Sequence, residues 1–222
     1  MSLNLKEKMT NYPNTKIHNT LPKILRHRSV SMPDTVALRD KDLGIWNEIT
    51  WKQYNNNVSY LALALSKRGF KTGDVIGLIG DNKPSWLYFE LAAQAVGGMS
   101  LGIYRDTLDE EVGYLINAAK VNFIYAEDQE QVDKILTIKR PKNSQITMFY
   151  EDSRGLKELN DPHIVDMLEL MNEGKAIANK TPNKYNQMID KVSDKQEAIS
   201  VSYTHLRAHE TEADLVCRLL LE

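Results

Sequence analysis

Cysteine is nearly absent from this sequence, because its 222 residues contain only Cys217, close to the carboxyl end. A single cysteine excludes a disulfide within the chain and any zinc site built from several thiolates. The sequence also lacks the G-x-x-x-x-G-K-[ST] string of a common phosphate loop. A dinucleotide fingerprint is missing as well, since Val75–Gly80 has two glycines but no third and no acidic residue at the usual distance.

An excess of charge of one sign is missing too. The sequence has 28 Lys and Arg against 30 Asp and Glu, a formal net charge of -2, which does not favour a nucleic-acid partner. No apolar run reaches the ~18 residues that a membrane-spanning helix needs. Residues 1–19 form a polar leader without the apolar core of a secretory signal. We therefore expect a cytoplasmic protein, with a peripheral membrane contact and a homodimer both left open.

The last 22 residues, Val201–Glu222, differ in character from the rest. Val201–Thr211 and Leu215–Glu222 both resemble the translation of a transposase-type DNA-sequencing adaptor, in one continuous reading frame. The residues between these two runs have the length of a library index. We therefore predict that residues 201–222 are an adaptor-derived artefact, and the alternative is an ordinary carboxyl-terminal helix.

This tail contains three features that would otherwise suggest a functional site. His205 and His209 would share one face of a helix, as a zinc-binding pair does. Cys217 would suggest a nucleophile, and residues 202–204 look like the start of a phosphate loop. We assign a role to none of them. Without the tail, the chain has no cysteine and 26 residues of each charge.

Hydrophobic periodicity predicts alternating strands and helices over residues 20–200. The expected helices are Thr20–Arg28, Thr50–Lys67, Asn82–Val96, Thr107–Ala119, Asp128–Ile138, Ile164–Met171 and Thr181–Asp190. The expected strands are Val36–Asp40, Trp46–Thr50, Val75–Ile79, Met99–Ile103, Phe123–Ala126, Ile146–Tyr150 and Glu197–Ser200. The first two strands form a hairpin, and the alternation that follows predicts an α/β fold with a mostly parallel sheet flanked by helices.

Local signals mark several of the expected helix ends. Capping boxes are predicted at residues 50–53 and 107–110, and Thr20 and Asp128 are expected as N-caps. Gly69 and the pair at 97–98 fit the ends of the helices before them. In the helix that follows residue 107, we expect a stripe of inward-facing side chains, namely Leu108, Val112, Leu115 and Ile116.

Ligands of α/β sheets bind in loops that follow buried strands. Two such loops hold the candidate substrate-side residues, which are Asp81, Asn82, Tyr104 and Arg105. The same residues also have structural interpretations. In these, Asn82 is a helix cap, Arg105 forms a surface ion pair with Asp106, and Tyr104 is a packed ring.

Other polar and aromatic residues are interpreted as structural. His18, His27 and His163 have no serine or acidic partner nearby in the sequence, so we expect surface or packing histidines. Trp86, Tyr88 and Phe89 recur at helical spacing, which is more typical of core contacts than of a platform that stacks bases.

Strings between about Leu21 and Leu136 resemble the amino-terminal portion of AMP-forming acyl-CoA synthetases. Their order matches the family, and the strings are ITWKQY (49–54), GFKTGDV (69–75), IGDNKPSW (79–86) and AAQAVGG (92–98). The more specific strings resemble the long-chain fatty acid CoA ligase branch, and these are GIYRDT (102–107), EVGY (111–114) and AEDQEQV (126–132).

The resemblance implies an enzyme that uses ATP, Mg²⁺ and coenzyme A. Such enzymes convert a fatty acid and ATP to an acyl-adenylate and pyrophosphate, and the thiol of coenzyme A then displaces AMP. The family's phosphate loop would follow a strand close to residues 197–200, and its lysine-bearing lid lies further on. We therefore carry over no catalytic, cofactor-binding or metal-binding residue, and expect none of these cofactors to bind the chain itself.

The resemblance therefore predicts a partial adenylation domain at residues 20–200. We expect the 222-residue chain to be poorly soluble and inactive, because part of the sheet would have no neighbouring strand. The alternatives are a non-catalytic α/β binding module, and an AMP-forming ligase for another carboxylic acid.

Overall fold

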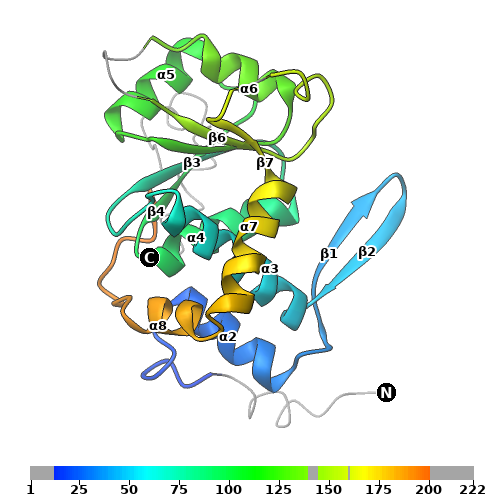
Figure 1. Ribbon diagram of the computed structural model, residues 1–222, viewed down its shortest axis with the longest axis vertical. Helices are drawn as coiled ribbons and strands as arrows, with labels where there is room; N and C mark the ends of the chain where they lie inside the picture. The colour runs from blue at the N-terminus through cyan, green and yellow to red at the C-terminus, as the bar shows by residue number, and fades with distance from the viewer. Residues whose placement is uncertain (1–12, 140–144, 160, 201–222) are drawn as a thin grey trace, which may run out of the picture.

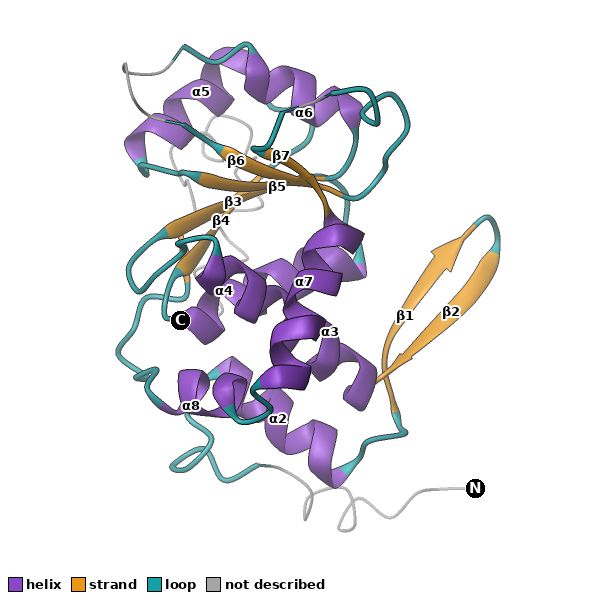
Figure 2. Cartoon of the chain, in the orientation of Figure 1, coloured by secondary structure: helices purple, strands orange, loops and turns teal. Residues whose placement is uncertain are grey.

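A six-stranded parallel sheet organises the computed structural model, which describes residues 13–139, 145–159 and 161–200 (Figures 1 and 2). Its strand order is β7-β6-β5-β3-β4-β8. These strands are β3 (Val75–Ile79), β4 (Met99–Ile103), β5 (Phe123–Ala126), β6 (Thr147–Tyr150), β7 (Ile164–Asp166) and β8 (Ile199–Ser200). The predicted α/β fold with a parallel, helix-flanked sheet is confirmed.

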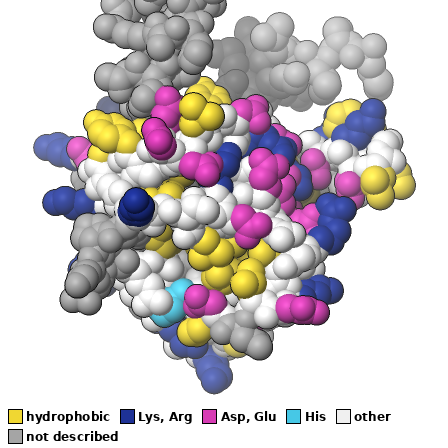
Figure 3. Space-filling model, turned by 90° about the horizontal axis from the view of Figure 1, so that it is seen from above, with side chains coloured by type: hydrophobic (Ala, Val, Ile, Leu, Met, Phe, Trp, Pro, Cys, Tyr) yellow, Lys and Arg dark blue, Asp and Glu magenta, His cyan; other side chains and the backbone are white. Residues whose placement is uncertain are grey.

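Helices cover both faces of this sheet. On one face lie α5 (Asp109–Ala118) and α6 (Gln129–Leu136), which are uppermost in Figure 1. The helices of the other face are α4 (Pro84–Val96), α3 (Trp51–Lys67), α7 (Met167–Lys180), α2 (Leu21–Ser31) and α8 (Lys184–Asp190). Seen from above, the α5 and α6 layer mixes acidic, basic and hydrophobic side chains (Figure 3). None of the helices within the described ranges is long and apolar enough to cross a membrane.

The central strands are buried on both faces, as a sheet between two helix layers requires. Neighbouring residues of β3 enter different cores, because successive strand side chains point in opposite directions. Leu78 packs with the α3 and α4 side, whereas Ile79 packs with the α5 and α6 side. In β5, Tyr125 and Ile124 divide in the same way. The sheet therefore separates two hydrophobic cores.

The hairpin formed by β1 (Val36–Asp42) and β2 (Ile45–Thr50) projects from the body in Figure 1. Leu43 and Gly44 form its turn with φ of 48° and 84°. Both angles lie in the left-handed region that primed hairpin turns require. Leu43 is 95% exposed at the tip. The predicted hairpin around Gly44 is confirmed, with β1 two residues longer than expected.

Several predicted caps are present. The hydroxyl of Thr50 accepts a hydrogen bond from the backbone N–H of Gln53, and the Gln53 side chain accepts one from the Thr50 N–H. Asp128 accepts a hydrogen bond from the N–H of Gln131 at the start of α6. Gly97 ends α4 with φ of 91°, a conformation that costs glycine little. Local sequence patterns thus determine these helix ends.

Other local predictions are wrong. The expected helix from Ile164 to Met171 is helical only from Met167, where α7 begins with Asp166 as its N-cap, and Ile164–Asp166 form strand β7 instead. No side-chain capping bond forms at α5, whose N-cap is Leu108, so the predicted capping box at 107–110 is absent. Leu108 precedes the first helical turn and is 70% exposed rather than buried.

Two further helix starts differ from expectation, although the helices exist. Thr20 occupies the N-cap position of α2, but its side chain makes no capping hydrogen bond. The helix α4 begins at Pro84 with Lys83 at the N-cap, so Asn82 lies outside it. Pro84 has no N–H to be capped, which suits it to the first helical position.

The helices α3 and α7 pack with their backbones unusually close. A Cβ added at Gly174 of α7 would lie 1.8 Å from the carbonyl oxygen of Tyr60 in α3. Beside this contact, Glu173 accepts hydrogen bonds from Lys67 at 2.5 Å and Arg68 at 2.8 Å. A glycine and a carboxylate together fix how α7 lies on α3.

Replacing Gly174 by alanine is expected to destabilise the chain by about 2–4 kcal/mol, because the new methyl group would overlap the α3 backbone. Gly113 in α5 is the matched control, since its added Cβ would make ordinary contacts of 3.4 and 3.8 Å with Ile138. Gly113→Ala should stabilise by roughly 0.5–1 kcal/mol through helix propensity. Urea unfolding would measure both, and equal stabilisation by the two changes would contradict the packing of α7 on α3.

Glu173→Gln should lower the free energy of unfolding by about 1 kcal/mol near pH 7. Burial alone would raise the pKa of Glu173, but hydrogen bonds from Lys67 and Arg68 hold it below its ordinary value of 4.5. The ion pairs therefore stabilise the fold above about pH 4.5, and this contribution is lost as pH falls through the lowered pKa. Unfolding of wild type and variant between pH 3 and 7 would test this. The difference should shrink with acid, whereas Glu158→Gln, at an exposed position, should show no such trend.

Candidate functional site

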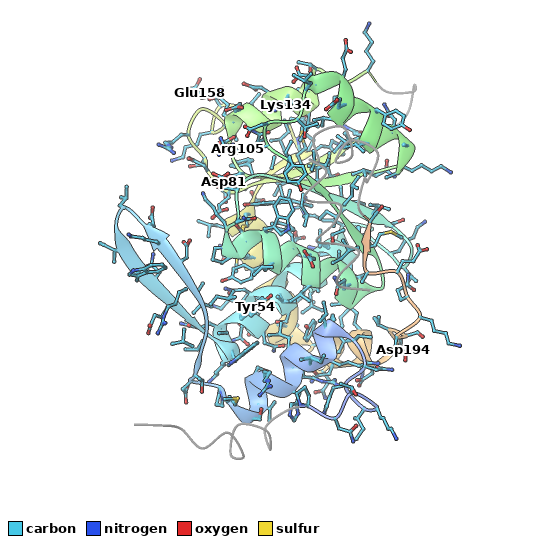
Figure 4. The ribbon with its side chains drawn as sticks, turned by 180° about the vertical axis from the view of Figure 1, so that it is seen from behind. Tyr54, Asp81, Arg105, Lys134, Glu158 and Asp194 are labelled. Atoms are coloured by element: carbon cyan, nitrogen blue, oxygen red, sulfur yellow. The ribbon has the colours of Figure 1, made fainter. Side chains whose placement is uncertain are left out.

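The loops at the carboxyl ends of neighbouring parallel strands bring charged residues together. Asp81 follows β3, Arg105 follows β4, Glu127 follows β5 and Glu151 follows β6. Figure 4 shows Asp81 and Arg105 close together at this edge, with Lys134 nearby. We name this region the carboxyl-edge cluster. It is where an open α/β sheet most often binds a ligand.

Arg105 links three of the loops in the cluster. Its Nη1 atom lies 2.6 Å from Oδ2 of Asp81, and its Nη2 atom lies 3.9 Å from carboxylate oxygens of Asp128 and Glu130. The Asp81 carboxylate raises the pKa of Arg105, followed by weaker contributions from Glu127 and Asp128. The predicted pair between Arg105 and Asp106 is therefore wrong, because the spatial neighbour is Asp81.

The backbone of this region is held from the other side by Lys134 of α6. Its ammonium group donates hydrogen bonds to the carbonyl oxygens of Arg105 at 2.6 Å and Thr107 at 3.1 Å. The loop after β4 is therefore fixed both through its carbonyl groups and through the Arg105 side chain.

Glu127 is the most buried charged residue of the cluster, with 7% of its surface exposed. One carboxylate oxygen accepts the Asp81 backbone N–H at 2.6 Å, and the other lies 2.8 Å from the Lys83 ammonium group. Its side chain crosses Gly80, where an added Cβ would lie 2.7 Å from the Glu127 Cβ. Gly80 has φ of 153°, so a larger residue would meet both backbone strain and a steric clash.

Lys83 is held in its charged form. Burial alone would lower the pKa of Lys83, but the hydrogen bond to Glu127 and the charges of Glu151, Glu127 and Asp152 raise it overall. The cluster thus keeps a cation between carboxylates from two neighbouring strands.

A second set of hydrogen-bonded residues joins the cluster to the first turn of α4. Tyr125 donates a hydrogen bond to Oε2 of Glu151 at 2.5 Å, and Ser85 donates one to the same oxygen at 2.5 Å. Ser85 and Tyr125 are also within 2.8 Å of each other. Burial raises the pKa of Tyr125, and the Glu151 charge raises it further. The phenol therefore stays a hydrogen-bond donor at neutral pH.

Asn82 and Tyr104 lie apart from these contacts. Asn82 lines a groove of about 270 Å³ between the β1–β2 hairpin and the start of α4, together with Asp40 and Trp86. The interpretation of Asn82 as a helix cap is wrong, since Lys83 occupies that position. Tyr104 is 69% exposed, so its interpretation as a packed ring is wrong too. The structure brings together only Asp81 and Arg105 of the four candidates.

Glu127, Glu151 and Lys83 were not among the residues selected from the sequence. The sequence does contain a signal for the two glutamates, because each directly follows a predicted strand. Applying the carboxyl-end rule to every strand, rather than to two, would have selected both. The position of Lys83 depends on Glu127, which is distant in sequence.

The interpretation of the three aromatic residues of α4 as core contacts is confirmed. Tyr88 and Phe89 are core residues as predicted, and Trp86 packs against the same core. The rings of His18 and His27 contact each other at a tilt of 34°, with centroids 4.4 Å apart. Within the described ranges, no group of His, Cys, Asp and Glu could hold a metal ion. His205, His209 and Cys217 lie outside the described residues.

The carboxyl-edge cluster can therefore orient a polar ligand, but its charges are mostly paired with one another. The last described strand, β8, is parallel to β4, so its carboxyl end faces the same edge. Side chains from successive loops can act together there, because the loops are fixed by Arg105, Lys134 and Glu127.

Glu127→Gln should destabilise the chain by about 1–3 kcal/mol, since it leaves Lys83 unpaired and weakens the bond from the Asp81 N–H. The control is Asp106→Asn at the exposed neighbour of Arg105, where the change should stay within about 0.5 kcal/mol. Urea denaturation of both variants would compare them. Equal effects would mean that Glu127 does not hold the loops.

Comparison with known proteins assigns this chain to a family. The AMP-binding enzyme family matches residues 25–204. The long-chain-fatty-acid–CoA ligase ACSBG2 of Rattus norvegicus is 28% identical over 160 residues, which cover 72% of this chain and 24% of the relative. The enzyme of the same name from Xenopus laevis is 30% identical over 145 residues, covering 65% of this chain and 19% of the relative. The chain thus spans about a quarter or less of these two relatives.

Solved structures share the fold. The adenylation and carrier didomain of a carboxylic acid reductase from Segniliparus rugosus matches with a TM-score of 0.58 at 14% identity, covering 76% of this chain and 29% of that one. A fatty acyl-adenylate ligase from L. pneumophila matches with a TM-score of 0.53 at 15% identity. The match covers 71% of this chain and 25% of that one. Because the family match extends over most of the sequence and the whole parallel sheet from β3 to β8, the chain belongs to the AMP-binding enzyme family.

Proposed function

We propose that residues 20–200 form the first part of the adenylation domain of an AMP-forming long-chain fatty acid CoA ligase. The observation that carries this proposal is the family match over residues 25–204, together with relatives that are named long-chain-fatty-acid–CoA ligases. The parallel sheet with a polar carboxyl edge supports it, because that edge suits a nucleotide-dependent enzyme.

The proposed reaction joins a fatty acid to coenzyme A in two balanced steps. The carboxylate attacks the α-phosphorus of ATP, which forms an acyl-adenylate and releases pyrophosphate. The thiol of coenzyme A then attacks the acyl carbon, which forms a thioester and releases AMP. Magnesium would neutralise the phosphates in the first step. The chain's own described residues supply a scaffold for these steps.

We further propose that the carboxyl-edge cluster sets the substrate side of this scaffold. Arg105 and Asp81 connect the loops after β4 and β3, so they would hold the walls of the crevice. Tyr104 is exposed on the same loop and could contact a substrate, whereas Asn82 would act through the groove beside the hairpin. The carboxyl end of β8 faces this edge, where a phosphate-binding loop would be well placed.

The nucleotide sequence of the source genome beyond codon 200 tests the proposal directly. We expect a glycine-, serine- and threonine-rich phosphate-loop string within a few codons, in place of the adaptor-like residues 201–222. A stop codon would instead favour the non-catalytic α/β binding module. An independent transcript that encodes Val201–Glu222 would contradict the adaptor interpretation.

The full-length enzyme from that gene would test the substrate. Pyrophosphate release should depend on ATP and Mg²⁺ and should be fastest with long-chain fatty acids. Medium-chain, aryl and amino acids are the comparison set, and faster release with any of them would replace the fatty acid in the proposal. Thioester formation should require coenzyme A, which separates the second step from the first.

A further inference from the structure

A groove of about 600 Å³ lies at the opposite edge of the sheet from the carboxyl-edge cluster. It is bounded by the loop between α3 and β3, the end of α4, and α8 with the residues after it. Both the α3–β3 and the α4–β4 connection lead into the amino ends of strands, so this is the amino edge. The groove is therefore separate from the site proposed for adenylation.

Three lysines line this groove, which we name the lysine groove. Lys71 comes from the α3–β3 loop, Lys184 begins α8, and Lys191 directly follows it. No acidic residue is found among its described lining residues. Within the described part of the chain, none of the three ammonium groups has a carboxylate or other side-chain partner.

Several other cationic side chains of the fold, in contrast, are paired with carboxylates. Arg26 of α2 pairs with Asp190 of α8, and Lys67 and Arg68 share Glu173. Lysines gathered around one concavity without a counter-charge repel one another, and that repulsion is relieved by a bound anion. The nearby Asp74 and Asp194 are not lining residues, and Asp74 accepts the Lys71 backbone N–H.

The remaining lining residues suit a ligand with both polar and apolar parts. Gln187 and Ser66 offer an amide and a hydroxyl, and the half-buried Val96 and Met188 provide apolar surface. The volume lies within the ~300–1,000 Å³ of typical small-molecule sites and is larger than one phosphate ion needs. Three lysines on different sides of the groove could also bind more than one anionic group at once.

We propose that the lysine groove binds a ligand that carries two or more phosphate groups. The ligand could be a free polyphosphate or nucleotide, or the phosphorylated headgroup of a lipid, since both present the same chemistry. This site is independent of the proposed ligase activity, because none of its lining residues belongs to the carboxyl-edge cluster.

The test measures binding of inorganic tripolyphosphate to the 222-residue chain at low micromolar concentration by calorimetry. The double variant Lys184→Ala/Lys191→Ala should weaken binding by about 10-fold or more, because two charge-assisted contacts are lost. The matched control is Lys175→Ala/Lys180→Ala, which removes the same charge from exposed positions of α7 outside the groove. The control should change affinity by less than about 2-fold once salt screens distant charges. Circular dichroism would show that both variants keep the wild-type fold.

A second readout locates the ligand without relying on the variants. Tripolyphosphate should protect Lys71, Lys184 and Lys191 from acylation, as measured by mass spectrometry, and leave Lys175 and Lys180 reactive. No binding, equal weakening by both double variants, or equal protection of all five lysines would overturn the proposal.

Comparison of probes then identifies the source of the phosphates. ATP and tripolyphosphate represent free ligands, and phosphatidylcholine vesicles with and without a bisphosphorylated inositol lipid represent a membrane. Stronger groove-dependent binding to the inositol-lipid vesicles would assign a headgroup, and stronger binding to the soluble probes would assign a free ligand. Binding to plain phosphatidylcholine vesicles that is insensitive to Lys184→Ala/Lys191→Ala would contradict a phosphate site.

Discussion

The central strands of the sheet have no face open to solvent, and the rest of the structure follows from this constraint. Parallel strands must be joined by crossovers, so helices cover both faces of β3, β5 and β6. The same parallel order directs every strand's carboxyl end to one edge, where charged loop residues must then coexist. Glu127 connects these charged loops, because it binds both the Lys83 ammonium group and the backbone N–H of Asp81.

Short-range signals predicted most of the fold, and failures occurred where the signal was ambiguous. The Thr50–Gln53 box and Gly97 depend on residues within one helical turn, so the sequence pattern is sufficient for them. The apolar run from Ile164 could be either strand or helix, and only its pairing with β6 decides in favour of a strand. Thr107 fits the capping pattern, but α5 begins at Asp109, so Leu108 rather than Thr107 occupies the N-cap position.

The candidate site was predictable in location but not in its contacts. The carboxyl-end rule placed Asp81 and Arg105 at one edge, and the structure shows them paired. The groups that hold them were missed, since the bond from Asp81 to Glu127 joins residues 46 apart and the contact of Ser85 with Glu151 joins residues 66 apart. Such pairs arise only when neighbouring strands come into register, which no local pattern encodes.

The contact between the first and last described helices also constrains how the chain folds during its synthesis. Arg26 of α2 pairs with Asp190 of α8, 164 residues later, and Lys23 donates to the Val192 carbonyl oxygen. At the usual ~5–20 residues per second, a ribosome would need roughly 10–30 s to make the intervening segment. Over that interval α2 can already pack on α3 and α4, its main neighbours, so only the bonds that join its side to α8 must wait until residues 184–192 have been made.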